Sequence, residues 1–248
     1  MPERHRTRWG CLLVLIVSAL AALFGWRTFE RYVAQHPEQF PWTELSLTDP
    51  VGPFTASKLA ALTGNPLQCR NLLDLAGDRD RPAPPITSEA EDCGYNDGMI
   101  LRPDDDQAVT FAPGGLITSC PVAAAMRLWE PLVQRAAARN LGSRVVRIEH
   151  FGSYSCRRLY GREGGRWSEH ATADAVDIAG FRLADGRRVT IAADWAAEGR
   201  DALFLREVRD SACDLFATVL SPDYNEAHRD HLHFDQAERG ARGGRLCR

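Results

Sequence analysis

Lysine is almost absent from this chain: Lys58 is the only one among 30 basic residues, and the others are all arginines. The arginines are spread along the sequence, and the formal net charge at pH 7 is −3, with a pI of about 6.2. A nucleic-acid-binding domain concentrates its positive charge in one patch or stripe. This charge balance gives no indication of a nucleic-acid partner, and we expect none.

The chain also lacks any pair of cysteines separated by two residues, the spacing of thiolate zinc sites and thioredoxin-type redox motifs. One of the seven cysteines, Cys11, lies inside an apolar segment. The other six are Cys69, Cys93, Cys120, Cys156, Cys213 and Cys247. An even set predicts a disulfide framework in an exported domain, and the sequence does not choose among the possible pairings.

Only one long hydrophobic run is present, from Trp9 to Trp26, and three arginines precede it. As a helix its ~18 residues would reach ~27 Å, which is just enough to cross a bilayer. The basic start favours a cytoplasmic N-terminus and an exported remainder. A cleaved signal peptide is the competing interpretation, because Ala19-Leu20-Ala21 resembles a cleavage site.

The length of the run and its flanking tryptophans favour an uncleaved anchor. We therefore expect a cytoplasmic segment at residues 1–8, a transmembrane anchor or signal sequence at 9–26, and a juxtamembrane tether at 27–50, where prolines interrupt any long helix. Residues 51–248 would form the exported domain. The predicted location is the bacterial inner membrane, crossed once, with this C-terminal domain in the periplasm.

Hydrophobic periodicity predicts an α+β domain. Helices are expected at residues 56–62, 121–141 and 201–220, and strands at 99–102, 144–151, 175–183, 188–192 and 231–235. Gly142 marks the end of the second helix, and Asp185-Gly186 predicts a hairpin between two of the strands. The expected architecture is an antiparallel sheet with flanking helices.

Two short stretches carry most of the chemistry: Ser168-Glu-His-Ala-Thr-Ala-Asp-Ala-Val-Asp177 and Asp230-His-Leu-His-Phe-Asp235. Histidine and aspartate suit zinc, and a catalytic zinc site uses three protein ligands and leaves a position open. His231 and His233 are two residues apart, so on a strand both side chains point to the same face. One could bind metal while the other addresses the substrate. Two histidines on a solvent-facing edge strand are the alternative.

The first stretch resembles the Ser-x-His-x-x-Gly-x-Ala-x-Asp signature of the zinc peptidases grouped as lysostaphin, D-Ala-D-Ala peptidase and hedgehog relatives, and the second resembles their His-x-His element. A wider set of motifs resembles the extensin-like C-terminal domain family from about residue 48 to 248. These motifs are Gly152-Ser-Tyr-Ser-Cys-Arg157, Ser168-Glu-His-Ala, Phe181-x-Leu-x-Asp-Gly186, Phe204-Leu-Arg206, Ala212-Cys213 and Tyr224-Asn-x-x-His228-x-Asp-His-x-His-x-Asp235.

The resemblance implies the core fold of the zinc peptidases and one zinc ion held by His170, Asp177 and His233. It places His231 beside the metal as a group that stabilises the transition state. Asp230 is the expected general base, and Glu226 is the fallback. Ala173 replaces the usual glycine of the first motif, and we expect the ligand geometry to survive this change because the residue is still small.

Four further residues receive alternative roles. Arg157 grips a substrate carboxylate or forms a structural ion pair, and Ser168 is an orienting hydroxyl at the substrate side of the site. His228 supports the ligands from behind or is a surface histidine, and Asp235 orients a ligand or ends a strand. Cys156 is expected to form half of a disulfide, since a Cys/His nucleophile would leave His170 and Asp177 unexplained.

The expected function is zinc-dependent hydrolysis of amide bonds in peptidoglycan peptides, with the membrane as the other partner through the N-terminal helix. The alternative is a catalytically silent metal-containing domain that binds wall peptide or a partner protein. Several points stay open at this stage: the bond and stereochemistry cleaved, endopeptidase against carboxypeptidase action, protein partners, and oligomeric state.

Overall fold

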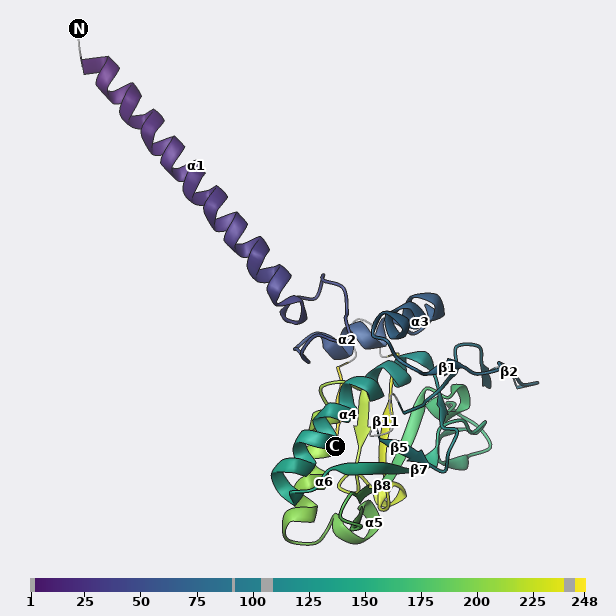
Figure 1. Cartoon of the computed structure of the whole chain (residues 1–248). Coiled ribbons are helices and arrows are strands. Elements are labelled where there is room, and N and C mark those ends of the chain that lie inside the picture. Colours follow the sequence, from purple (N-terminus) through teal and green to yellow (C-terminus); the bar gives the residue numbers. More distant parts are fainter. Residues whose placement is uncertain (1–2, 91, 104–108, 239–243) are drawn as a thin grey trace.

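A single helix, α1 (Glu3–Gln35), projects from the rest of the chain in the computed structural model, which describes residues 3–90, 92–103, 109–238 and 244–248 (Figure 1). The side chains of Arg4, Arg6 and Arg8, which underlie the predicted orientation, lie outside the described part. From Cys11 to Gln35 the helix is apolar and long enough to span a membrane, and its apolar side chains are exposed. The helix continues through residues 27–35, which were predicted as tether, and it ends just before Pro37 because proline cannot extend it.

Three short helices follow α1: the 3-10 turn η1 (Pro37–Gln39), α2 (Thr55–Ala60) and α3 (Pro66–Leu75). The helix predicted at 56–62 corresponds to α2, whereas α3 was not predicted. Asn65 caps α3 by accepting a hydrogen bond from the backbone N–H of Gln68 (3.4 Å), with proline at the first helical position. Residues 45, 47 and 51 pack against the main core, so the stretch after η1 adheres to the domain.

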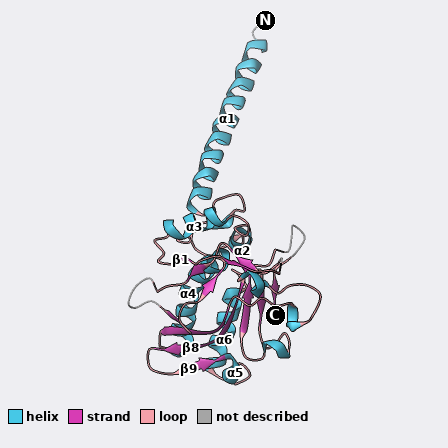
Figure 2. Ribbon diagram, turned by 90° about the vertical axis from the view of Figure 1, so that its right-hand side faces the viewer, coloured by secondary structure: helices cyan, strands magenta, loops and turns pink. Residues whose placement is uncertain are grey.

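The centre of the domain is a seven-stranded sheet in the order β12-β10-β11-β8-β7-β5, with β9 also paired to β8 (Figure 2). Its strands are β5 (Thr110–Ala112), β7 (Val145–Gly152), β8 (Ala175–Leu183), β9 (Arg188–Thr190), β10 (Thr218–Leu220), β11 (Leu232–Asp235) and β12 (Leu246–Cys247). The central pairs are antiparallel, as expected, and the predicted hairpin joins β8 to β9. Both edge pairs, β5–β7 and β10–β12, are parallel, which corrects the prediction of an antiparallel sheet.

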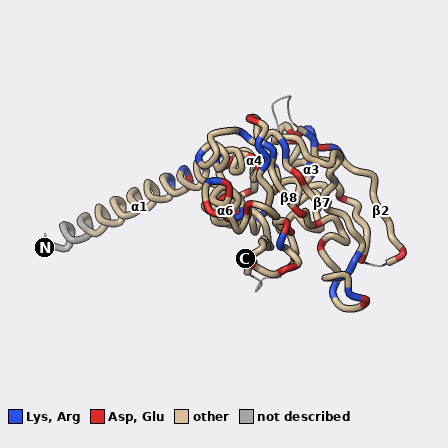
Figure 3. Tube along the Cα trace, turned by 90° about the horizontal axis from the view of Figure 1, so that it is seen from below, with Lys and Arg blue, Asp and Glu red and all other residues tan. Residues whose placement is uncertain are grey.

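Two small sheets lie beside the main one. One consists of β1 (Arg81–Pro82), β4 (Met99–Ile100) and β6 (Ile117–Thr118), and the other of β2 (Ile86–Thr87) and β3 (Gly94–Tyr95). The strand predicted at 99–102 corresponds to β4. Acidic and basic positions are interspersed along the trace of the domain in Figure 3.

The helices α4 (Cys120–Leu141) and α6 (Arg200–Ala212) pack against the central sheet. Trp129 of α4 is fully buried and its ring contacts Phe181 of β8 and Phe234 of β11, while Phe204 of α6 contacts Phe181 as well. Ser119 caps the start of α4, and Gly142 ends it in the left-handed conformation (φ 65°), as the sequence predicted.

Two predicted elements end earlier in the structure than the sequence indicated. The helix expected at 201–220 stops at residue 212, and residues 218–220 form β10, because this buried β-branched segment pairs with β11 and β12. The strand expected at 188–192 stops at Thr190. The Thr190 side chain then caps a short helix, α5 (Ile191–Asp194), by accepting from the backbone N–H of Ala193 at 3.3 Å.

The six predicted cysteines form three disulfides: Cys69–Cys120, Cys93–Cys156 and Cys213–Cys247. The first fastens α3 to the start of α4, and the third fastens the end of α6 to β12. Cys156 is therefore half of a disulfide, as expected, and Cys11 is free and exposed on α1. Three disulfides indicate an oxidising compartment.

Candidate metal centre

His170 is presented by a tight turn just before β8. The Ser168 hydroxyl accepts from the backbone N–H of His170 (3.4 Å) and begins the 3-10 helix η3 (Glu169–Thr172). Ala173 ends this helix with φ 59°, in the left-handed region where glycine is at ease. Its carbonyl accepts from the backbone N–H of Ser119 (2.8 Å) and from the hydroxyl of Ser153 (3.1 Å). These bonds hold the turn, so Ala173 keeps its left-handed conformation.

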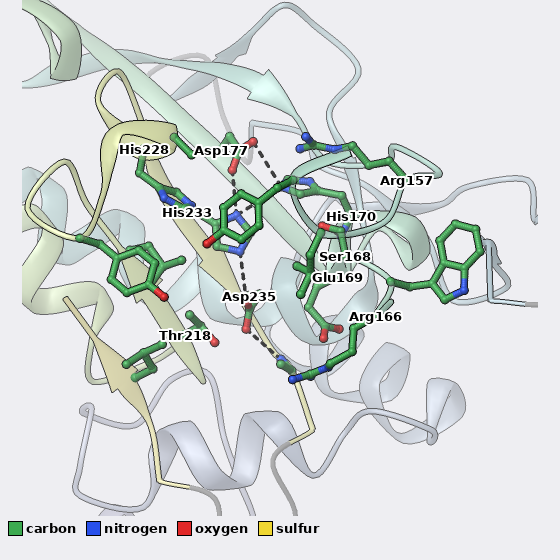
Figure 4. Close-up of a pocket in the computed structure, with 18 of the residues that line it drawn as sticks. Arg157, Arg166, Ser168, Glu169, His170, Asp177, Thr218, His228, His233 and Asp235 are labelled. Atoms are coloured by element: carbon green, nitrogen blue, oxygen red, sulfur yellow. Dashed lines mark hydrogen bonds and ion pairs between the residues drawn. The ribbon is translucent and has the colours of Figure 1, made fainter. Parts of the chain in front are cut away.

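Asp177 and His233 come from neighbouring strands. They are direct partners in the register between β8 and β11, so both side chains lie on the same face. His233 Nδ1 lies 2.9 Å from Asp177 Oδ1, His170 Nε2 lies 3.2 Å from Asp177 Oδ2, and the two facing histidine nitrogens are 3.2 Å apart (Figure 4). All three residues are buried. The structure thus brings together the three predicted ligands, a group that could hold a metal ion.

In each of the two histidines of this group, the ring nitrogen that points away from the group is hydrogen-bonded, which fixes the ring. His170 Nδ1 donates to the carbonyl oxygen of Ser153 at 2.6 Å, so its Nε2 faces the group. His233 Nε2 contacts Asp235 Oδ2 at 3.1 Å, and Asp235 Oδ1 accepts from the backbone N–H of Ala237 at 3.0 Å. Asp235 therefore orients a predicted ligand and is also the last residue of its strand. Partners of this kind set the tautomer and direction of metal-binding imidazoles.

Burial and the neighbouring charged side chains shift the pKa values of Asp177 and His233 in opposite directions. Burial alone would raise the pKa of Asp177, but hydrogen bonds with His170 and His233 hold it far below its usual range. Burial opposes protonation of His233, but Asp177 and Asp235 outweigh it and raise its pKa to about 9. Without a cation, the proton of His233 is what offsets the two carboxylates. A metal ion would take the place of that proton.

His231 lies beside the group and is held from behind by Asp230. Its Nδ1 lies 2.9 Å from Asp230 Oδ1, and its Nε2 lies 3.5 Å from Asp177 Oδ1. The ring also contacts Phe151 and His228. His231 thus lies next to the three predicted ligands, whereas the Asp230 carboxylate, the predicted general base, contacts the ring of His231.

His228 is buried rather than a surface residue. Burial, together with the nearby imidazoles of His233 and His231, lowers its pKa to about 4, so the ring is neutral at neutral pH. Its Nδ1 lies 2.7 Å from Asn225 Oδ1. Since an amide oxygen only accepts, Nδ1 carries the proton and Nε2 carries the lone pair. Asn225 was not predicted, and it fixes this tautomer.

The group lies at the floor of a cavity of about 600 Å³. Arg157 and Ser168, the predicted substrate-side residues, line it, as does Arg166 (Figure 4). The carboxylates that line it are Glu169, Asp177 and Asp235. Neither Asp230 nor Glu226 belongs to the lining, and the Glu226 side chain is 85% exposed and paired with Arg229 at 3.6 Å. Glu169 was missed although it directly precedes His170 in the first motif.

One wall of the cavity is the loop at residues 157–168, which closes on itself through a bridge between Arg158 and Trp167. The Arg158 guanidinium stacks over the Trp167 ring at 4.3 Å. At the tip, Tyr160 has φ 57°, and its hydroxyl accepts from Asn225 Nδ2 at 3.3 Å. Asn225 therefore joins this loop to His228, which also lines the cavity. Positive φ at a bulky residue is strain of the kind that collects at functional sites.

The family model described as extensin-like protein C-terminus matches residues 67–248. No curated protein and no solved structure gives a significant match. The matched range contains the His170, Asp177 and His233 group and the whole cavity lining. Helix α1 and the residues before 67 lie outside it.

Proposed function

The chain belongs to the extensin-like protein C-terminus family, and we propose that it is an exported zinc peptidase that hydrolyses amide bonds in peptidoglycan peptides. The single observation that carries this proposal is the buried His170, Asp177 and His233 group at the floor of an open cavity. Two histidines and a carboxylate with oriented rings form a donor set of the catalytic zinc type.

The spacing of the donor atoms suits zinc. Ligand atoms around a tetrahedral zinc lie about 3.3 Å apart, given bonds of about 2.0–2.1 Å. The two facing imidazole nitrogens lie 3.2 Å apart, and each lies 2.9–3.2 Å from a different oxygen of Asp177, so a small movement of the side chains would place both nitrogens and one oxygen around the ion. Among the described residues no second group of this kind is present, which predicts one zinc per chain. When bound, the zinc would supply the Lewis acidity that polarises an amide carbonyl and acidifies a water molecule.

We assign the proton transfers to His231. Its Nε2 faces the ligand group while Asp230 contacts Nδ1, the arrangement in which a carboxylate orients an imidazole that transfers protons. His231 would accept a proton from the attacking water and return it to the leaving amine. Asp230 then acts through His231 as a positioning residue, which differs from its predicted role as a direct base.

Recognition of the peptide falls to the cavity wall. Arg157 and Arg166 both line the cavity, and a guanidinium can bind a carboxylate through two parallel hydrogen bonds. Peptidoglycan peptides carry free carboxylates. The substrate class rests on the resemblance to peptidases that act on the wall and on the predicted periplasmic location, which the three disulfides and the apolar α1 support.

A second candidate function is a silent metal-containing domain that binds wall peptide or a partner protein. The observation that favours it is the absence of both predicted bases, Asp230 and Glu226, from the cavity lining of the described residues. A domain that needs only to hold a peptide has no need of a proton acceptor. The two candidates differ in whether His231 is required.

The test is release of fragments from purified peptidoglycan by the full-length, disulfide-bonded chain loaded with zinc, followed by mass spectrometry. Release that is lost in both His170→Ala and His231→Ala supports the peptidase, and the fragment masses identify the bond. Binding to peptidoglycan without any release, unchanged in His231→Ala, supports the silent domain. Glu226→Gln is the matched control, because this exposed carboxylate lies outside the lining.

A further inference from the structure

Five aromatic side chains gather where α1 meets the domain, and we call them the aromatic collar: Trp26, Phe29, Tyr32, Phe40 and Trp42. The first three lie on the last turns of α1. The other two come from the segment after η1, which turns back beside the helix (Figure 1). Ring centroids are 6.0 Å apart for Phe29 and Phe40, 6.1 Å for Tyr32 and Phe40, and 5.1 Å for Phe40 and Trp42. The collar therefore joins two separate stretches of chain.

The collar is open to its surroundings. Trp42 is 68% exposed, Trp26 58% and Tyr32 52%, and none of the five belongs to the hydrophobic core of the described residues. Surfaces that face water rarely expose a cluster of large aromatic side chains. Tryptophan and tyrosine collect instead at the boundary between lipid and water, where an apolar ring and a polar edge are both satisfied.

The position of the collar along α1 matches such a boundary. The helix carries no charged residue between Trp9 and Trp26, and on the domain side of that run it carries Arg27, Glu30 and Arg31. The run from Trp9 to Trp26 would cover ~27 Å, about the thickness of a bilayer core. The headgroup region then begins at Trp26 and includes the level of Phe29 and Tyr32.

The returning half of the collar is fastened to the domain by the only lysine. Lys58 of α2 donates from Nζ to the carbonyl of Pro37 (3.0 Å) and to the hydroxyl of Thr43 (2.8 Å), on either side of Phe40. Thr43 in turn donates to the carbonyl of Phe40 at 2.9 Å. Burial lowers the pKa of Lys58, as expected for an ammonium enclosed by the turn it holds. Movement of Trp42 relative to the domain is thereby limited.

We propose that the aromatic collar inserts into the phospholipid headgroup region on the domain side of the membrane, and that Lys58 holds the domain against the bilayer surface through it. The occupant of this surface is the membrane that α1 crosses, because the collar begins at Trp26, where the apolar run of that helix ends. The proposal goes beyond the peptidase function and rests on the retention of α1 as an anchor. Under this proposal residues 27–50 are not a loose tether. They hold the domain in a fixed position relative to the membrane.

The test uses the full-length chain in vesicles of phosphatidylethanolamine and phosphatidylglycerol that contain lipids brominated close to the headgroup. Tryptophan emission is compared for the native chain, Trp42→Phe, and the control Trp167→Phe, whose ring lies in the cavity loop. The expected result is a smaller bromine-quenched emission in Trp42→Phe, where Trp9 and Trp26 remain as quenched residues, and no decrease in Trp167→Phe. Acrylamide in the water should reach Trp42 poorly.

Equal quenching in all three chains, with Trp42 open to acrylamide, overturns the proposal. Flotation of the same vesicles separates this failure from failure of the anchor. If the native chain does not float with the vesicles, α1 is not a retained anchor and the collar proposal falls with it. Peptidoglycan cleavage by the chain in detergent solution is measured separately, so neither outcome decides the peptidase function.

Discussion

His233 and Asp177 are direct register partners on the antiparallel strands β11 and β8, with Nδ1 and Oδ1 2.9 Å apart. Because side chains alternate along a strand, this pairing fixes both donors on one face near the centre of the sheet. His170 reaches the same point from the capped turn before β8. The three side chains therefore come from paired central strands and a hydrogen-bonded turn, and these rigid elements hold the site in a fixed geometry.

Zinc binding should release a proton. The neighbouring carboxylates raise the pKa of His233 to about 9, so at neutral pH its Nδ1 can bind metal only after losing a proton. Between pH 7 and 9 the apparent zinc affinity should rise about tenfold per pH unit. Calorimetry in buffers of different ionisation enthalpy measures the released proton. A pH-independent affinity over this range would contradict the assignment.

The metal-free chain should lose stability as pH rises from about 6.5 to about 9. The folded pKa of His233 lies above its ordinary value of 6.5, so the proton stabilises the folded state fully below 6.5, and that contribution fades as pH approaches 9. Thermal unfolding in the presence of a chelator should show a falling Tm across this window. Saturating zinc should remove the trend, and His233→Gln should lack it altogether.

Removing the carboxylate behind His231 should lower turnover without removing metal. Asp230→Asn leaves the three metal donors in place and deprives His231 of a partner 2.9 Å away, so we expect kcat to fall about 10²–10⁴-fold, the usual range for acid–base assistance. Zinc content, measured on the same preparation, should stay near that of the native chain. Glu226→Gln should keep native kcat. Equal losses of kcat in Asp230→Asn and Glu226→Gln would refute the role of Asp230 in positioning His231.

Ala173 should accept glycine but not valine. Glycine relieves the left-handed conformation at φ 59° but gives up a buried methyl group, and the two effects, each about 1 kcal/mol, nearly cancel. Valine adds a β-branch at a fully buried, positive-φ position and should cost more than about 2 kcal/mol. Denaturant unfolding of the two variants measures the difference. If Ala173→Val and the native chain have the same free energy of unfolding, the left-handed conformation at residue 173 does not strain a branched side chain.

The elements with strong local signals could be predicted from the sequence. Residues 175–183 form β8 as expected, and α4 ends at Gly142, because a run of buried apolar residues and a left-handed stop are both local features. The six cysteines of the framework were recognised by their number. Their pairing depends on which distant segments meet, and the structure supplies it.

What the sequence did not reveal depends on tertiary contacts. Residues 218–220 form a strand only because β11 and β12 pair with them, and the parallel edges depend on where distant chain segments return. Within the site, the donor types and spacing located His170, Asp177 and His233. The link from Tyr160 through Asn225 to His228 joins two segments that are far apart in the sequence, and no spacing rule anticipates it.

The most direct measurement is the zinc content of the purified full-length chain and of its His170→Ala variant, determined by elemental analysis on folded, disulfide-bonded protein. The account predicts close to one zinc per native chain and a loss of that zinc in the variant, because the variant lacks one of the three buried donors. A native chain that holds no metal after incubation with zinc, or a variant that holds as much as the native chain, would contradict it.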